Sequence, residues 1–162
     1  MKPVKLFSLA LSAVLLLCSC SRKEYTDSVS CRELGDDMLS ALSDGQEYTE
    51  YDSTHRQFYF EDTEDYDDCC IIYSLDTNDI NEIGIFHARN AESAGEVAED
   101  CREYVNDMKE DSRAFIASYA PAELPKLDNA EVRVWGNYVI YTILPTPIPD
   151  TVLRAIETKL TK

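Results

Sequence analysis

Few of the reactive side chains in this sequence have the spacing that a catalytic or metal site requires. Nucleophilic catalysis needs a nucleophile beside a base, and the sequence offers two histidines, His55 and His87, for that role. Neither Gly-x-Ser-x-Gly, His-Glu-x-x-His nor a glycine-rich phosphate loop occurs. We interpret His87, inside a predicted strand, as a structural residue and His55, beside Arg56, as a solvated one. We therefore expect no catalytic residues, no metal and no cofactor.

Carboxylates offer a second source of chemistry, because they crowd the segment 61–68. Oxygen ligands of this kind bind calcium, and a pair held at a fixed distance could support hydrolysis. A charge run is more often a solvated segment, here one that keeps the approach to an apolar strand soluble. We favour the solvated interpretation and keep a solute- or calcium-binding, or hydrolytic, function of 61–68 as the alternative hypothesis.

A third candidate is one face of a predicted hairpin at 131–144. Gly136-Asn137 suits a type II′ turn, and the resulting pairing of Trp135 with Tyr138 places four residues on a partly covered face. This candidate binding surface consists of Arg133, Trp135, Tyr138 and Ile140. Trp, Tyr and Arg are enriched at binding hot spots, although the aromatic pair could simply stabilise the hairpin.

The first twenty residues predict the cellular location of the protein. A short basic start is followed by an apolar run, Leu6 to Leu17, which is too short to span a bilayer. Leu17-Cys18-Ser19-Cys20 then resembles the lipobox of bacterial lipoproteins, with a small residue directly before the cysteine. Cys18 fits less well, because Leu17 precedes it. We expect cleavage of a signal peptide, residues 1–19, and a diacylglyceryl anchor on Cys20 that holds the protein at the extracytoplasmic face of the bacterial membrane.

The net charge of the chain limits the kinds of partner that it can bind. A formal net charge of −16 disfavours nucleic acid and anionic bilayer surfaces and names no other partner. The predicted envelope location makes an extracytoplasmic protein the expected partner. We expect residues 20–27 to form a lipidated tether that holds a single domain, 28–162, off the membrane.

The other cysteines are Cys31, Cys69, Cys70 and Cys101. An even number in an exported chain fits disulfides, and buried free thiols fit equally well.

Hydrophobic periodicity predicts the elements that must position these residues. They are a helix over about 27–43, strands over 69–75 and 82–88, a helix over 90–119, the hairpin over 131–144 and a final helix from 146, with 46–68 as a partly ordered connection. Ile83 and Ile85 lie on one side of their strand and Phe86 and Ala88 on the other, which indicates a central strand. The expected fold class is α+β. Two ββα units form a four-stranded antiparallel sheet with helices packed mainly on one face, preceded by an N-terminal helix.

The stretch from about Tyr59 to Lys159 resembles a family of uncharacterised bacterial lipoproteins, found largely in Gram-positive anaerobes. The resemblance rests on the aromatic and acidic approach to the first strand, on the run from Asn81 to Phe86, on the long charged helix and on Gly136-Asn137-Tyr138-Val139; the Cys69-Cys70 pair departs from it. It implies an envelope location and one small domain, and it brings no activity with it. The sequence as a whole predicts a lipid-anchored, non-catalytic binding or scaffolding module.

Overall fold

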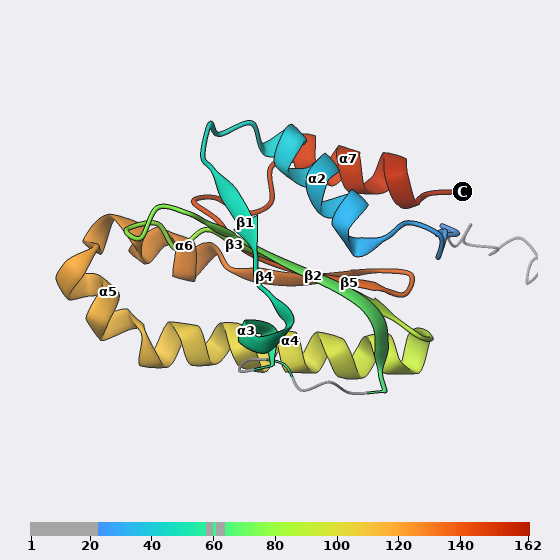
Figure 1. Ribbon diagram of the computed structural model, residues 1–162, viewed down its shortest axis with the longest axis horizontal. Helices are drawn as coiled ribbons and strands as arrows, with labels where there is room; N and C mark the ends of the chain where they lie inside the picture. Colours follow the sequence, from blue (N-terminus) through green and yellow to red (C-terminus); the bar gives the residue numbers. More distant parts are fainter. Residues whose placement is uncertain (1–22, 58–59, 61–63) are drawn as a thin grey trace, which may run out of the picture.

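The computed structural model describes residues 23–57, 60 and 64–162, which form a layer of sheet between two layers of helix (Figure 1). The sheet is antiparallel with strand order β1-β2-β3-β5-β4. Its strands are β1 (Tyr48–Glu50), β2 (Tyr66–Ser74), β3 (Glu82–Ala88), β4 (Glu131–Trp135) and β5 (Tyr138–Ile143). Helices α2 (Cys31–Leu42) and α7 (Asp150–Leu160) cover one face, and α4 (Ala91–Asp111) covers the other. The short helices are α3 (Ser53–Arg56), α5 (Arg113–Tyr119), η1 (Pro121–Glu123) and α6 (Leu124–Asn129).

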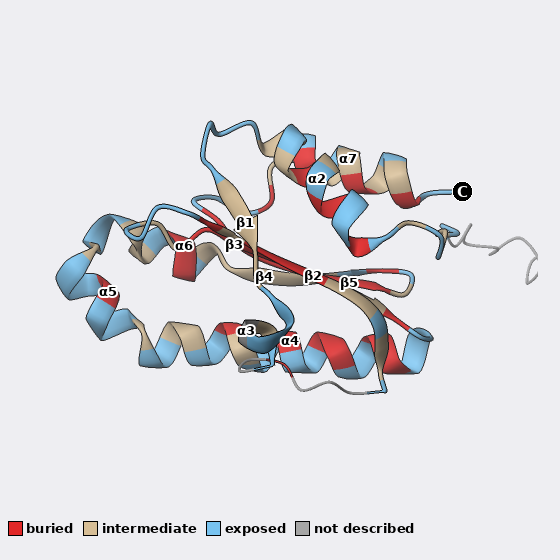
Figure 2. Ribbon diagram, viewed as in Figure 1, coloured by how far each residue is buried: buried red, intermediate tan, exposed pale blue. Residues whose placement is uncertain are grey.

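Both faces of the sheet are buried because the two central strands are apolar on both sides. In β3, Ile83 and Ile85 pack under α2 and α7, while Phe86 packs under α4. Every residue of β5 is buried, and Figure 2 shows this continuous buried band through the middle of the molecule. Such strands need an apolar cover on each side, and the two helical layers supply it.

The predicted α+β class with an antiparallel sheet is confirmed, but the predicted strand number and helix placement are wrong. The sheet has five strands, because β1 pairs with β2 inside the segment interpreted as a connection. Both hairpins are followed by a helix as expected, yet α4 and α7 lie on opposite faces of the sheet. A strand of three residues is too short to show a period-two pattern, and the order of elements does not specify which face a helix covers.

Each of the three predicted helices differs from the structure at one boundary. The helix predicted from about residue 27 begins at Cys31, and the helix predicted from 146 begins at Asp150. The helix predicted over 90–119 begins as expected, directly after Asn90. The Ser30 hydroxyl accepts a hydrogen bond from the Glu33 N–H at 3.2 Å, and the Asn90 side chain accepts from the N–H groups of Glu92 and Ser93. These contacts satisfy N–H groups that a helix leaves unpaired. The helix predicted over 90–119 is interrupted at Ser112, where the chain turns from α4 into α5.

The β4–β5 hairpin has the predicted register and turn. Trp135 pairs with Tyr138, and Gly136 has φ = 62°, the left-handed conformation expected at the first position of a type II′ turn. The folded domain begins earlier than the predicted residue 28, because Tyr25 forms a β-bridge with Thr161 and the Thr26 N–H donates to the Leu160 carbonyl at 2.8 Å. Residues 23–27 of the predicted tether 20–27 are therefore part of the fold.

Gly84 provides the clearest test of the packing under α4. It faces Tyr141 across the β3–β5 pair, and a Cβ at this position would overlap the buried tyrosine ring. We expect Gly84→Ala to lower the free energy of unfolding by about 1–3 kcal/mol through overpacking, measured by urea denaturation. Gly95→Ala is the matched control: Gly95 is exposed in α4 with open space around it, so the change should stabilise by about 0.5–1 kcal/mol. Equal effects of the two changes would contradict this account of the Tyr141 packing.

Candidate functional site

The structure places the predicted hairpin surface inside the protein. Arg133, Trp135, Tyr138 and Ile140 share one face of the sheet, as expected, but α2 and α7 cover that face. Trp135 is 6% exposed, and Tyr138 and Ile140 are 0% exposed. The Tyr138 hydroxyl donates to the Val29 carbonyl at 2.6 Å, and the partly exposed Arg133 pairs with Glu131. The prediction of an exposed binding surface here is therefore wrong, because a strand pattern shows which residues share a face and not whether a distant helix covers it.

The described part of the acidic segment is bound into the fold. The Asp67 carboxylate lies 2.7 Å from Nδ1 of His87, and Nε2 of the same ring lies 3.6 Å from Asp27. Asp68 accepts a hydrogen bond from the N–H of Cys31 at the start of α2. A negative charge at this end of a helix interacts favourably with the helix dipole. Residues 61–63 lie outside the described part, and the described residues contain no group of three His, Cys, Asp or Glu side chains that could hold a metal.

The most unusual titratable group is the carboxyl group of Glu82, the first residue of β3. It is 6% exposed, and its Oε1 accepts hydrogen bonds from the hydroxyls of Tyr141 at 2.6 Å and Tyr104 at 2.8 Å. A third hydroxyl, that of Tyr51, also hydrogen bonds to this carboxyl group. Glu82 is not among the predicted site residues, although an acidic residue that opens a strand apolar on both sides is a recognisable signal.

Neighbouring elements bring the three hydroxyls to Glu82. Gly84 lets the Tyr141 ring lie across β3, so that its hydroxyl reaches two residues back along the strand. Tyr104 comes from α4, and Tyr51 follows β1 with its ring stacked on Tyr73 at 4.1 Å. Phe60 closes the group, packing against the rings of Tyr104 and Tyr141. The result is a closed aromatic core around a single carboxyl group.

Burial is the main influence on this group. Removal from water raises the pKa of Glu82, and the hydroxyls of Tyr141, Tyr104 and Tyr51 oppose that rise without cancelling it. Burial likewise raises the pKa of Tyr141 well above its usual value. A perturbed carboxyl in a cleft would suggest an active site, but this one is enclosed by tyrosines and the sheet. The arrangement supports a structural role.

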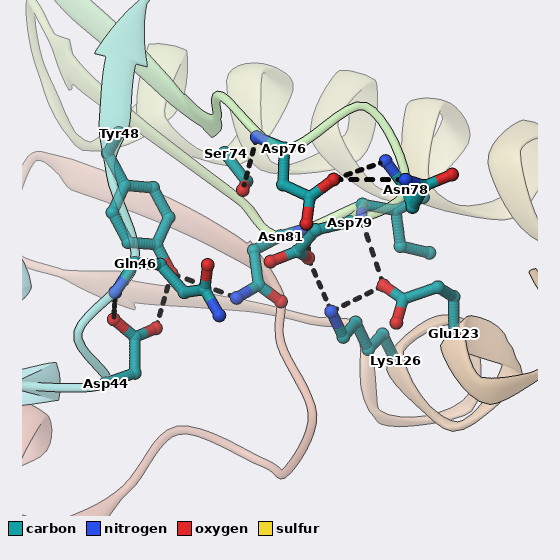
Figure 3. A network of polar contacts seen from close by, with 11 residues as sticks. Asp44, Gln46, Tyr48, Ser74, Asp76, Asn78, Asp79, Asn81, Glu123 and Lys126 are labelled. Carbon is teal, nitrogen blue, oxygen red and sulfur yellow. Dashed lines mark hydrogen bonds and ion pairs between the residues drawn. The ribbon is translucent and has the colours of Figure 1, made fainter.

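A second polar cluster fastens the β2–β3 loop to the rest of the protein (Figure 3). Lys126 of α6 is 7% exposed, and its Nζ lies 2.5 Å from carboxylate oxygens of both Asp79 and Glu123. Glu123 also accepts from the Ile80 N–H at 3.1 Å. Burial alone would raise the pKa of Asp79, but the hydrogen bonds from Lys126 and from the Asn81 N–H outweigh it and lower the pKa. Breaking one partner of such a buried pair leaves an uncompensated charge.

The same cluster continues toward β1. The Asn81 side-chain amide donates to the Tyr48 hydroxyl at 2.9 Å, and that hydroxyl donates to Asp44 at 2.6 Å. Figure 3 shows these side chains converging from three separate segments. They fill the end of the sheet with paired polar groups, and the cluster contains no nucleophile next to a free base. Its geometry supports a structural clamp.

The four described cysteines are free thiols and form no disulfides with one another, a choice that the sequence left open. Cys31, Cys70 and Cys101 are buried, and Cys69 is partly exposed. Burial raises the pKa of Cys70 to about 12 and that of Cys31 and Cys101 still further. A thiol is nucleophilic as its thiolate, so these three groups are poor candidates for catalysis.

The largest exposed apolar feature belongs to α5. Phe115 is 65% and Tyr119 75% exposed, and their rings lie 4.6 Å apart. One uninterrupted helix over 90–119, as predicted, would place both rings on the same apolar face as Cys101 and Val105. The interruption at Ser112 instead rotates α5 so that Ile116 alone of its residues is buried. One signal pointed to this segment: residues 112–122 contain no acidic residue, in a chain of net charge −16.

The predicted anchor residue, Cys20, and the predicted signal peptide, residues 1–19, lie outside the described residues. Within residues 23–57, 60 and 64–162, no helix is both long enough and apolar enough to cross a bilayer.

Glu82 gives a pH-dependent prediction. Because the folded state raises the pKa of Glu82 above the ordinary 4.5, it keeps a proton that the unfolded chain releases, and stability falls as pH rises above 4.5. Glu82→Gln removes this loss, because glutamine does not ionise. We therefore expect the difference in free energy of unfolding, variant minus wild type, to be larger at mildly alkaline pH than at acidic pH by about 1 kcal/mol or more.

The measurement is urea denaturation over that pH range. Glu103→Gln, which makes the same chemical change at an exposed position of α4, is the control and should follow the wild-type profile. Parallel pH profiles for Glu82→Gln and wild type would contradict the assignment of Glu82 as a destabilising buried acid.

Comparison with known protein families matches a Domain of unknown function (DUF4358) over residues 44–144. The matched region runs from just before β1 to just after β5. It therefore contains the whole sheet, α4, α5 and both polar clusters, while α2 and α7 lie outside it. Comparisons with curated proteins and with solved structures gave no match. Since the match covers more than half of the chain, this protein belongs to the DUF4358 family, whose function is unknown.

Proposed function

We propose that this protein is a lipid-anchored, non-catalytic module at the extracytoplasmic face of the bacterial membrane, and that it binds another envelope protein through α5. The location is supported by the lipobox-like sequence Leu17-Cys18-Ser19-Cys20. The absence of catalysis is supported by the two polar clusters, because their central groups, Glu82 and Lys126, are buried and paired.

The exposed Phe115–Tyr119 pair carries the binding part of the proposal. These rings lie four residues apart on a short helix. Proteins that bind a helix in an apolar groove recognise side chains with this spacing. Burying one such side chain contributes about 1.5–3 kcal/mol, and aromatic residues dominate hot spots. Leu75 and Val134 are the other large apolar side chains exposed among the described residues, and each lacks an aromatic neighbour of this kind.

Charge indicates which kind of partner fits. The single charged residue between Asp111 and Glu123 is Arg113, which pairs with Asp128, so α5 avoids the repulsion that the rest of this polyanion exerts. A second copy would bring another net charge of −16 close by and would be repelled. We therefore favour a different protein with an apolar groove over self-association. The calcium alternative gains no support, because the described carboxylates of 64–68 do not converge on a metal site.

The anchor is tested by changing each cysteine of the lipobox-like sequence in turn. We expect Cys20→Ala to abolish acylation and to leave the leader uncleaved, because the thioether to diacylglycerol needs this thiol. Cys18→Ala is the matched control and should leave acylation unchanged. Intact-mass analysis of membrane-extracted protein measures both. An unmodified Cys20 in the wild type, or acylation that survives Cys20→Ala, would refute the proposed location.

The binding surface is tested by photo-cross-linking in intact cells. A photoreactive phenylalanine analogue at position 115 or 119 should give one adduct of defined mass, whereas the same analogue at the exposed positions Leu75 and Val134 should not. Phe115→Ser should abolish the adduct formed from position 119, with little loss of stability because the ring is largely exposed. Adducts that are identical from all four positions, or absent from both α5 positions, would contradict the proposal.

A further inference from the structure

The N-terminal segment, residues 23–27, is part of the folded body. The Thr26 N–H donates to the Leu160 carbonyl at 2.8 Å, and the Lys162 N–H donates to the Glu24 carbonyl at 3.1 Å. Between these bonds Tyr25 and Thr161 form an antiparallel bridge. The segment therefore runs alongside the chain that leaves α7, held by main-chain hydrogen bonds on both sides of the bridge.

Side chains fasten the same segment to the β4–β5 turn and to α7. Tyr25 lies directly over Gly136, where an added Cβ would come within 2.9 Å of the Tyr25 Cβ. The Asn137 amide donates to Asp27 at 3.0 Å, and Lys23 pairs with Glu157 at 2.8 Å. The path of the chain is thus determined from Lys23 onward.

This attachment leaves very little chain between the domain and the proposed anchor. Cys20 lies three residues before Lys23, and an extended chain spans at most about 3.6 Å per residue. The Cα atom of Lys23 is therefore within about 11 Å of the Cα atom of Cys20. If Cys20 carries the diacylglyceryl group, its backbone lies at the bilayer surface, and so does this end of the domain.

We propose that the anchored domain rests on the lipid headgroup layer with the end formed by residues 23–25, 134–137 and 162, and that α5 points away from the bilayer. This inference rests on the proposed lipidation of Cys20. The β4–β5 turn, residues 23–25 and the end of α7 lie at one end of the sheet, and α5, α6 and the β2–β3 loop lie at the other (Figure 1).

The chemistry of this end suits phospholipid headgroups. An open hollow of about 670 Å³ is bordered by Lys23, Lys162, Glu24, Asp27, Val134 and Asn137. Lys162 is exposed, and so is Lys23, which also pairs with Glu157; both can approach lipid phosphates, which zwitterionic and anionic lipids share. Val134 is 44% exposed and places an apolar side chain at the same surface. Glu24 and Asp27 are exposed beside the lysines, so this end suits zwitterionic lipids, which carry no net charge and do not repel a chain of net charge −16.

Energy transfer to the bilayer tests the orientation. Full-length acylated protein, carrying a fluorescent amino acid at position 134 or at position 115, is reconstituted into phosphatidylcholine vesicles that contain a headgroup-labelled acceptor lipid. We expect transfer from position 134 to be several-fold more efficient than transfer from position 115. A flexible Gly/Ser insertion of about twelve residues between Arg22 and Lys23, with an r.m.s. span of about 20 Å, should abolish most of that difference.

The outcomes separate this inference from the proposed location. Equal transfer from the two positions in protein whose mass shows the acyl group would overturn the orientation and leave the anchor intact. An unchanged difference after the insertion would overturn the role assigned to the short connection. A mass without the acyl group, with no transfer from either position, would overturn the anchor and this inference together.

Discussion

The central constraint in this protein is that β3 and β5 are apolar on both sides. A strand of this kind is stable only when water is excluded from both of its faces. One layer is supplied by α4, which directly follows β3, and the other is assembled from α2 and α7, which come from opposite ends of the chain. The two terminal helices therefore meet over one face, and this contact draws the N-terminal segment against the end of α7.

The same exclusion of water governs the polar groups that remain inside. Glu82 and Lys126 are charged residue types in buried positions, where a group without partners would cost several kcal/mol. Each has compensating contacts, three tyrosine hydroxyls around Glu82 and two carboxylates around Lys126. Because these contacts leave the groups closed to solvent, the clusters hold the β2–β3 end of the sheet together and are poorly suited to turnover of a substrate.

The two surfaces that we propose for contact with other molecules lie at opposite ends of the sheet. One end carries the N-terminal segment and exposed lysines, and the other carries α5, where two aromatic rings stand in water on a helix free of acidic residues. An anchored protein with a short connection to the membrane would present these ends to different surroundings. Because the two ends of the sheet differ in this way, we propose that one end contacts the bilayer and the other contacts a protein partner.

The sequence by itself determined the features that depend on neighbouring residues. Asn90 starts a helix, Gly136 shapes a hairpin turn, and the alternation in β3 marks a central strand, because backbone and side-chain preferences act over a few residues. The tertiary structure alone decided that α2 and α7 bury Trp135, Tyr138 and Ile140, that β1 joins the sheet, and that the turn at Ser112 leaves Phe115 exposed. It also brought Tyr51, Tyr104 and Tyr141 to Glu82. These outcomes depend on contacts between segments far apart in the chain, and the free energy of burying one surface against another is not encoded in the local pattern of either.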